Sequence, residues 1–370
     1  MEFTVRKFEI LREIGLTQGV IEKKTTIPIL ANLLMEAAGD TVELAATDLE
    51  LGIKTSCPVK VKKPGAITTP AKSFLEIIRS LPDADIRIKT LENNWVQITC
   101  ASASFKIVGL PKDNFPNLPE LSHTLVDIPA KALLSLISKT IFAIATEESR
   151  YTFNGALLLL RPLSATMVAT DGHRLAHVEK QMPLDHLNSE VRTLIPKKAL
   201  AELQRLLVEA EEKDTVSFGK DETHLFFRIK NRLMISRMLT GQFPNYEAVL
   251  PKENNKSVIL NREDIGAAIK RVSLLADDKS RSIRILLDEN KMEISSSNAD
   301  LGEAREVIDT NYNAGPIQIG FNCQYLLDFI MATEDTKISF DFKDDQSAGQ
   351  MRPATEEEYR YRYIVMPMRL

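Results

Sequence analysis

The sequence predicts an α+β chain that contains three tandem copies of one domain plan, each with two helices packed against an antiparallel sheet. Two observations predict this plan. A helix begins near Pro70, Pro196 and Asn322, so the spacing is 126 residues twice (196 minus 70, and 322 minus 196). Elsewhere apolar and polar residues alternate with period two, which is typical of antiparallel strands with one buried face. Because 370 residues make three copies of about 123, we expect three domains, over residues 1–120, 121–248 and 249–370.

A short strand that leads into an amphipathic helix opens each copy. The three openings lie at residues 3–11, 126–134 and 258–265. Pro129 suits the first turn of a helix, and the side chain of Asn261 can cap a helix N-terminus. These two residues therefore predict where the first helix of the second and third copies begins.

Two shorter motifs recur at nearly the same spacing. A Thr-Asp turn begins at Thr47 and again at Thr170, 123 residues later (170 minus 47), and Asn298-Ala299-Asp300 is a weaker match in the third copy. The first two copies close on a Phe-Pro-Asn segment, at Phe115 and Phe243, 128 residues apart (243 minus 115). The clearest alternating segments, which predict strands, are residues 86–88, 96–100, 105–107, 216–218, 225–229, 233–235, 283–287 and 338–342.

The composition is that of a soluble globular protein. With 44% apolar and 26% charged residues, disorder over the whole length is excluded. No apolar run approaches the roughly 20 residues that a membrane helix needs, and the first residues lack the pattern of a secretory signal. The three cysteines, Cys57, Cys100 and Cys323, form no C-x-x-C pair. We therefore expect neither a zinc site nor a disulfide framework, and a reducing, cytoplasmic setting.

The distribution of charge bears on nucleic-acid binding. The net charge of −4 argues against it, because DNA-binding domains are usually basic. The predicted helix segments nevertheless sum to +6, which leaves −10 on the rest of the chain. If these helices face one way, they form a positive surface that could follow a phosphate backbone. The alternative is that Lys and Arg are simply good helix formers on solvated faces. The segments counted are residues 3–24, 68–80, 128–139, 196–209, 261–271 and 320–331.

The sequence contains no motif of catalytic chemistry. His173 and His177 are four residues apart, but no cluster of acidic residues or cysteines supplies a third zinc ligand. Asp171 and His173 could form a general base pair, yet no nucleophile motif accompanies them. No phosphate-binding glycine loop is present. We therefore expect no enzyme, no metal and no cofactor.

Two features predict a binding site. The C-terminus is apolar from Tyr363 onward and contains Met366 and Met368. Such an end is either a final core strand with a docked tail or one wall of an adaptable groove. The second feature is Phe243-Pro244-Asn245-Tyr246, at the junction of the second and third copies, where ligand grooves are common.

Over its whole length the sequence resembles the bacterial sliding clamps, the beta subunits of DNA polymerase III. The resemblance depends on several motifs that occur in order along the chain. They are Ile27-Pro28-Ile29-Leu30 with Asn32-Leu33-Leu34, Ala46-Thr47-Asp48-Leu49-Glu50, Arg150-Tyr151 with Asn154-Gly155, Ala169-Thr170-Asp171-Gly172-His173-Arg174-Leu175-Ala176, Phe243-Pro244-Asn245-Tyr246 and Val365-Met366-Pro367-Met368-Arg369-Leu370.

The resemblance implies a DNA clamp fold and a non-catalytic processivity subunit. Two chains would form a head-to-tail homodimeric ring with twelve helices around a central hole and the sheets outside. The ring would encircle double-stranded DNA without reading its sequence. It would tether the DNA polymerase III alpha subunit, the clamp loader, other polymerases and repair proteins through short apolar motifs. Because a closed ring holds DNA by topology, an acidic chain with weakly basic helices is compatible with this function.

The resemblance also implies positions for three kinds of site. The partner-peptide pocket would be formed by Phe153, Thr170, Gly172, His173, Arg174, Leu175, Pro244, Val249, Asn322, Tyr325, Ile364, Val365, Met366, Pro367 and Met368. The residues near DNA would be Lys24, Arg79, Tyr151, Lys197 and Lys198. At the dimer seam, Phe105 and Ile107 of one protomer would meet Leu274 and Leu275 of the other. Residues that differ from those usual in the family stand at Phe153, Ala248 and Ser280.

Two other functions remain compatible with the sequence. One is a peptide-binding scaffold of the same fold that does not encircle DNA. The other is an enzyme with an unrecognised site, which would show turnover that disappears when one polar cluster is mutated.

Overall fold

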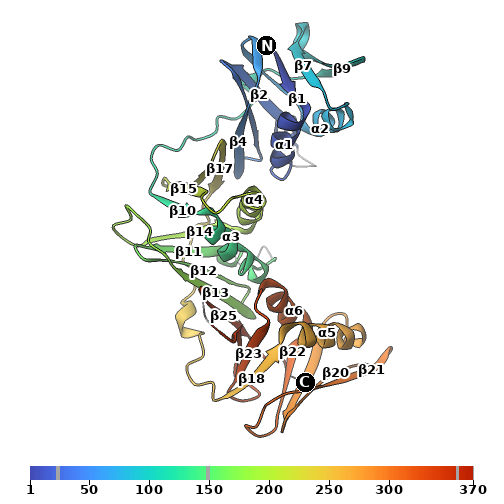
Figure 1. The fold of residues 1–370 in the computed structure, drawn as a ribbon, viewed down its shortest axis with the longest axis vertical. Coiled ribbons are helices and arrows are strands. Elements are labelled where there is room, and N and C mark those ends of the chain that lie inside the picture. Colours follow the sequence, from blue (N-terminus) through green and yellow to red (C-terminus); the bar gives the residue numbers. More distant parts are fainter. Residues whose placement is uncertain (22–25, 147–150, 356–357, 370) are drawn as a thin grey trace. The chain divides into compact units, whose positions relative to one another are not determined.

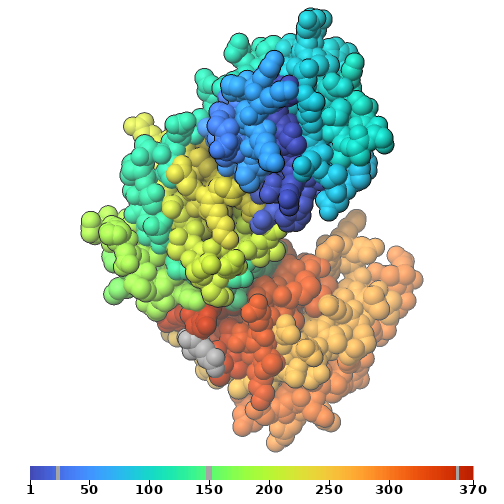
Figure 2. Space-filling view, turned by 45° about the horizontal axis from the view of Figure 1, so that its top comes forward, coloured from blue at the N-terminus to red at the C-terminus, as the bar shows by residue number. Residues whose placement is uncertain are grey.

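The computed structural model describes residues 1–21, 26–146, 151–355 and 358–369. The chain forms two compact units (Figure 1). The first contains Met1–Lys131 and Lys198–Met238, and the second contains Ala132–Lys197 and Leu239–Leu370. In the space-filling view, the residues of the first unit from 198 onward (yellow) lie directly beside its N-terminal residues (blue) (Figure 2).

The α-helices of the described residues begin where the sequence predicts. Pro70 directly precedes α2, and the side chains of Asn261 and Asn322 accept hydrogen bonds from backbone N–H groups in the first turns of α5 and α6. The helices are α1 (Lys7–Thr17), α2 (Ala71–Ser80), α3 (Ala130–Ser138), α4 (Lys197–Leu207), α5 (Arg262–Val272) and α6 (Cys323–Ala332). No helix in the described part of the chain is long and apolar enough to cross a membrane.

The first unit contains a five-stranded and an eight-stranded antiparallel sheet. The five-stranded sheet has the order β5 (Lys60–Lys63), β1 (Glu2–Arg6), β7 (Asp85–Thr90), β8 (Trp95–Cys100) and β9 (Ala103–Val108). The eight-stranded sheet has the order β10 (Val126–Pro129), β15 (Thr215–Lys220), β16 (His224–Ile229), β17 (Arg232–Arg237), β4 (Leu51–Pro58), β3 (Thr41–Thr47), β2 (Asn32–Ala38) and β6 (Gly65–Pro70).

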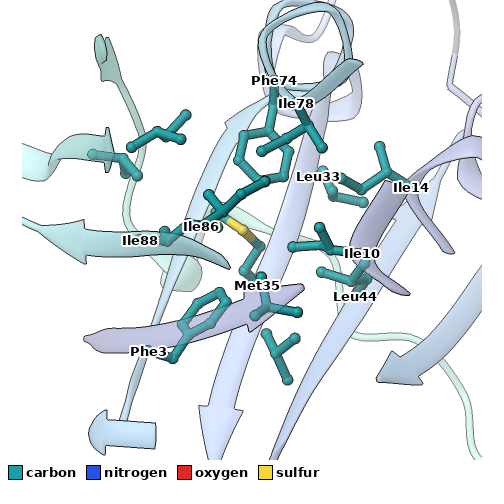
Figure 3. Packing of buried hydrophobic residues seen from close by; sticks show 14 of the residues in the cluster. Phe3, Ile10, Ile14, Leu33, Met35, Leu44, Phe74, Ile78, Ile86 and Ile88 are labelled. Carbon is teal, nitrogen blue, oxygen red and sulfur yellow. The ribbon is translucent and has the colours of Figure 1, made fainter. Parts of the chain in front are cut away.

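One core joins both sheets of the first unit to α1 and α2. Ile10 of α1 and Phe74 of α2 are fully buried together with Phe3 and Ile86 from the small sheet and Met35 from the large one (Figure 3). The apolar stripe of each helix therefore packs against the buried faces of two sheets.

The second unit contains an eight-stranded and a four-stranded antiparallel sheet. The first has the order β14 (Val191–Pro196), β11 (Gly155–Arg161), β12 (Ser164–Thr170), β13 (Arg174–Gln181), β25 (Tyr359–Val365), β24 (Gly349–Pro353), β23 (Lys337–Phe342) and β18 (Lys256–Asn261). The second has the order β21 (Gly302–Asp309), β20 (Lys291–Asn298), β19 (Ser282–Asp288) and β22 (Ile317–Asn322). Short 3₁₀ helices occur at Pro28–Ala31 (η1), Glu92–Asn94 (η2), Lys112–Asn114 (η3), Ile141–Ala143 (η4), Tyr151–Phe153 (η5), Tyr246–Ala248 (η6) and Ser273–Leu275 (η7).

The α+β prediction is confirmed, but each of the two eight-stranded sheets spans two copies. Strand β17 of the second copy pairs with β4 of the first, with Ser236 opposite Leu51. In the same way β13 pairs with β25 of the third copy, with Leu175 opposite Ile364. Local alternation predicts a strand but not its neighbour, so these long-range pairings could not be read from the pattern. The division at 120 and 248 stays a prediction.

The sequence left open whether the C-terminal segment is a core strand with a docked tail or one wall of a groove. The structure shows features of both. Residues up to Val365 form the buried core strand β25. The residues that follow, which we call the tail, dock on both sheets of the second unit, because the Met366 N–H donates to the His173 carbonyl at 2.9 Å and the Met368 N–H donates to the Gly320 carbonyl at 2.8 Å. The tail thus extends the four-stranded sheet beyond β22.

Candidate functional site

A pocket of about 130 Å³ opens in the second unit. Four segments enclose it: the end of η5, the β12–β13 turn, the linker of residues 239–255 between the second and third copies, and the end of β25 with the tail. Its walls are formed by Phe153, Thr170, Gly172, His173, Arg174, Leu175, Pro244, Tyr246, Val249, Ile364 and Met366.

The structure brings together ten of the fifteen residues predicted for this pocket. The other five, which do not line it, lie close by in sequence or structure. Val365 is buried at the end of β25, Met368 forms the bridge to Gly320, and Pro367 lies between the two docked methionines. Asn322 caps α6, and the Tyr325 ring lies against Arg174.

Tyr246 lines the pocket although the set implied by the resemblance omits it, and it belongs to the junction segment that the sequence predicts to be part of a binding site. It is 7% exposed and packs with Phe243 and Ile364 in one apolar cluster. Its position directly after the Phe-Pro-Asn segment was the available signal, because a large aromatic residue at a domain junction commonly anchors the linker.

The β12–β13 turn is fixed by its own side chains. The Thr170 hydroxyl donates to the Arg174 carbonyl at 2.6 Å and accepts from the Gly172 N–H at 3.1 Å. The Asp171 carboxylate accepts from the N–H groups of His173 and Arg174 at 3.0 and 3.1 Å. Gly172 has a φ of 91°, which favours glycine. The turn therefore presents its backbone to the pocket in one conformation.

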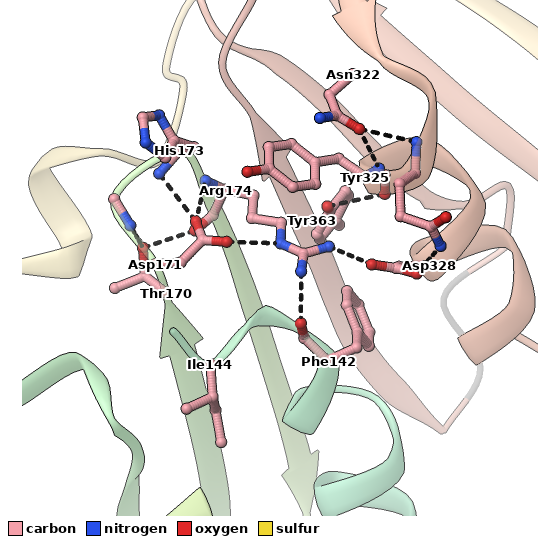
Figure 4. Close-up of polar contacts among 12 residues, drawn as sticks. Phe142, Ile144, Thr170, Asp171, His173, Arg174, Asn322, Tyr325, Asp328 and Tyr363 are labelled. Atoms are coloured by element: carbon pink, nitrogen blue, oxygen red, sulfur yellow. Dashed lines mark hydrogen bonds and ion pairs between the residues drawn. The ribbon is translucent and has the colours of Figure 1, made fainter. Parts of the chain in front are cut away.

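The Arg174 guanidinium lies behind this turn and joins it to α6 (Figure 4). Its Nε donates to Asp171 at 2.9 Å, one Nη donates to Asp328, and the other donates to the Phe142 carbonyl at 2.6 Å. The guanidinium also lies 4.3 Å from the centre of the Tyr325 ring. Burial alone would lower the pKa of Arg174, but the neighbouring acidic groups outweigh it and raise that pKa above its usual value.

The two histidines with metal-ligand spacing have different surroundings. His173 is exposed at the rim of the pocket, whereas His177 is buried, with its ring 5.6 Å from that of Tyr246. Burial, together with the charge of Arg362, lowers the pKa of His177 to about 4, so it is neutral at physiological pH. Among the described residues, no group of three or more His, Cys, Asp or Glu side chains is arranged to hold a metal ion.

The residues predicted to lie near DNA have varied surroundings. Lys24 lies outside the described residues, and so does the side chain of Tyr151, whose backbone belongs to η5. Arg79 is exposed on α2, and the exposed Lys198 ammonium pairs with Asp48. Lys197 differs from these, because its ammonium is half-buried and donates to the Ile144 carbonyl at 3.1 Å. Burial and the neighbouring Arg174 charge lower the pKa of Lys197.

The residues predicted for the dimer seam lie at ends of the two smaller sheets. Phe105 and Ile107 are half-buried on β9, an edge strand in the first unit. Leu274 and Leu275 belong to η7 in the second unit, and Leu274 is 77% exposed. This η7 segment contacts β21, the edge strand of the four-stranded sheet.

Three family models match the chain in succession. They describe the N-terminal, central and C-terminal domains of the DNA polymerase III beta subunit and match residues 1–119, 127–245 and 247–369. The beta sliding clamp of Vibrio cholerae is 30% identical over 372 residues, which cover all of both chains.

The chain belongs to the bacterial beta sliding clamp family. Its fold agrees with this assignment. The sliding clamp of Pseudomonas aeruginosa bound to griselimycin is similar with a TM-score of 0.94 and 32% identity, over all of both chains. The beta sliding clamp of C. crescentus, with polyethylene glycol bound to a putative beta-motif tethering region, has a TM-score of 0.94 and 31% identity, over all of this chain and 99% of that one.

The function of this beta sliding clamp follows from its family. It is a DNA sliding clamp, a non-catalytic processivity subunit of DNA polymerase III, as the sequence resemblance implied.

Proposed function

We propose that this beta sliding clamp acts in the bacterial cytoplasm as a head-to-tail homodimer. Its ring encircles double-stranded DNA, and its pocket tethers the DNA polymerase III alpha subunit, the clamp loader, other polymerases and repair proteins. Each protomer contributes the three domains 1–120, 121–248 and 249–370. The pocket, which collects eleven residues from four separate segments, is the observation that carries this proposal.

The chemistry of the pocket supports an extended apolar peptide as its ligand. Val249 and Met366 remain 41% and 44% exposed there, so apolar surface is available for burial. A methionine side chain adapts its shape to different apolar partners. The exposed residues Gly172 and His173 beside the docked tail also favour a ligand in extended conformation. The whole predicted set, including Asn322, Tyr325, Val365, Pro367 and Met368, belongs to this site in our proposal.

The free sheet edges support ring closure. In the described structure β9 and β21 each have a paired neighbour on one side only. Copies within the chain are already joined by antiparallel pairing, at β17 with β4 and at β13 with β25. Pairing of β9 with β21 of a second protomer repeats that arrangement and removes both edges. The contact of Phe105 and Ile107 with the partner's Leu274 and Leu275 then buries apolar surface at the seam.

Removal of the tail tests the pocket. A chain that ends at Val365 loses the Met366 wall and both docking hydrogen bonds, and we expect it to lose griselimycin binding, measured by isothermal titration calorimetry. The control is Met331→Ser, which changes an exposed apolar residue of the same unit outside the pocket lining. Full affinity of the truncated chain would contradict the assignment of the pocket.

Ring formation is tested by negative-stain electron microscopy at a concentration that favours the dimer. We expect closed rings with a hole wide enough for a duplex. Compact particles of one chain's size would instead favour a peptide-binding scaffold. Charge reversal of Lys24, Lys197 and Lys198 should shorten retention on circular DNA and leave griselimycin binding unchanged. The Lys197 and Lys198 changes also need a thermal melt, because both ammonium groups are bonded within the protein.

A further inference from the structure

The Arg174 guanidinium has little capacity left for a ligand. All three of its nitrogens already donate, to Asp171, to Asp328 and to the Phe142 carbonyl. Its side chain is 9% exposed, and those of Asp171 and Asp328 are 16% and 15% exposed. Arg174 thus contributes to the pocket wall as a fixed surface rather than as a free donor.

Asp328 links the pocket wall to a distant part of the chain. It lies on α6, 154 residues from Arg174, and it does not line the pocket. Its second oxygen accepts from the Gln324 side chain at 2.7 Å, one turn earlier on the same helix. The Gln324 side chain therefore orients the Asp328 carboxylate independently of Arg174. Because this carboxylate accepts from the guanidinium, the position of α6 determines where Arg174 lies.

The first copy has the same turn without an arginine. The Thr47 hydroxyl donates to the Leu51 carbonyl at 2.9 Å, and Asp48 accepts from the N–H groups of Glu50 and Leu51. Leu51 therefore aligns with Arg174. Asp48 instead pairs directly with Lys198 of α4, so this turn is joined to a helix without an arginine. The turn motif alone does not require an arginine. The presence of Arg174 beside the pocket therefore has a cause other than the conformation of the turn.

We propose that Asp328, together with Asp171, is a positioning residue of the peptide pocket. The two carboxylates hold Arg174 so that the turn of residues 170–175 keeps a fixed spacing from α6 and β25. A pocket formed in advance binds more tightly, because the ligand does not have to order its walls. This inference rests on the proposed peptide-binding function of the pocket.

Substitution of Asp328 by asparagine in the full-length dimer tests the proposal. The amide keeps the size of the side chain and removes its charge. We expect griselimycin, measured by isothermal titration calorimetry, to bind about tenfold more weakly. We also expect the Nε proton of Arg174 to exchange faster with solvent. Its NMR signal is a signature of the fixed guanidinium. Asp328→Glu retains the charge and should recover part of the affinity, and it serves as the test if Asp328→Asn does not fold.

Asp341→Asn is the matched control. Asp341 is also a mostly buried carboxylate in the second unit, and it pairs with Arg352 at 2.9 Å outside the pocket. We expect this variant to lower the melting temperature but to keep wild-type affinity. Wild-type affinity and an unchanged Arg174 resonance in Asp328→Asn would overturn the positioning role. If the wild-type chain itself does not bind griselimycin, the proposed pocket function fails, and this inference fails with it.

Discussion

The two linkers between copies pack on their sheets in different ways. In the first unit, Leu118 of the linker lies over Gly52, where an added Cβ would come within 2.9 Å of a Leu118 methyl group. In the second unit, the aligned positions are Tyr246 and Leu175, and both line the pocket. The comparison teaches that one repeat plan yields a filled junction or an open one, depending on which side chains meet beneath the linker.

The same two junctions also differ in their interior. Arg232 of β17 donates to Glu13 of α1 at 2.9 and 3.1 Å, with both side chains 6% exposed, and Thr55 also donates to Glu13. In β25 the residue aligned with Arg232 is Tyr361, whose hydroxyl donates to the Lys139 carbonyl of the second copy at 2.8 Å. The neighbouring Tyr363 ring lies 5.6 Å from that of Phe142, also in the second copy. One junction is therefore joined by a buried ion pair and the other by buried aromatic side chains.

Breaking the buried ion pair should have the largest effect. Arg232→Met leaves the Glu13 carboxylate buried without its partner, which should cost about 3–5 kcal/mol of unfolding free energy in urea titrations. The double variant Glu13→Leu/Arg232→Met removes both charges and should recover most of that loss. A double variant as unstable as Arg232→Met would contradict the account of the first junction.

The second largest effect on stability should come from alkaline pH, which weakens the aromatic junction of the second unit. Burial raises the pKa of Tyr361 and Tyr363 above that of an exposed tyrosine. Their contribution to stability is therefore complete below the unfolded-state pKa of about 10 and is lost as the pH rises beyond it, by at most about 1.4 kcal/mol per pH unit for each tyrosine. Urea midpoints at pH 9, 10 and 11 measure the slope. Tyr361→Phe/Tyr363→Phe should flatten it, and an unchanged slope would contradict this assignment.

A double-mutant cycle tests the filled junction, and we expect a smaller loss of unfolding free energy there. Gly52→Ala should destabilise the chain by about 1–3 kcal/mol, because the new methyl group meets Leu118. In a Leu118→Ala background the same change should cost less than about 0.5 kcal/mol. Equal costs in both backgrounds would show that Leu118 does not fill this junction.

The smallest effect concerns the two Thr-Asp turns. Leu49 has a φ of 78° in the first turn, where the second turn has Gly172. Leu49→Gly relieves a left-handed conformation but adds chain entropy to the unfolded state, so unfolding free energy should change by less than about 0.5 kcal/mol. Gly172→Ala should cost about 1 kcal/mol. A large loss in Leu49→Gly would mean that its half-exposed side chain has a packing role.

The resemblance could be carried over to the candidate pocket because many of its residues form short motifs. The segment from Thr170 to Leu175 and the end of β25 are each contiguous in sequence, and both line the pocket. Asp328 could not be predicted, because a lone carboxylate on an amphipathic helix looks like a solvated residue. Lys197 is predicted to lie near DNA, but the burial of its ammonium could not be predicted, because it depends on the position of the Ile144 carbonyl, 53 residues away.

The sequence by itself determined the elements, the three-copy plan and the family. Helix starts at Pro70, Asn261 and Asn322 follow from local capping and backbone preferences, and strands follow from alternation. Only the tertiary structure decided which strands pair across copies and which junction stays open. The reason is physical: pairing and packing depend on the shapes of side chains that meet from distant parts of the chain, as Leu118 meets Gly52, and no local pattern encodes that meeting.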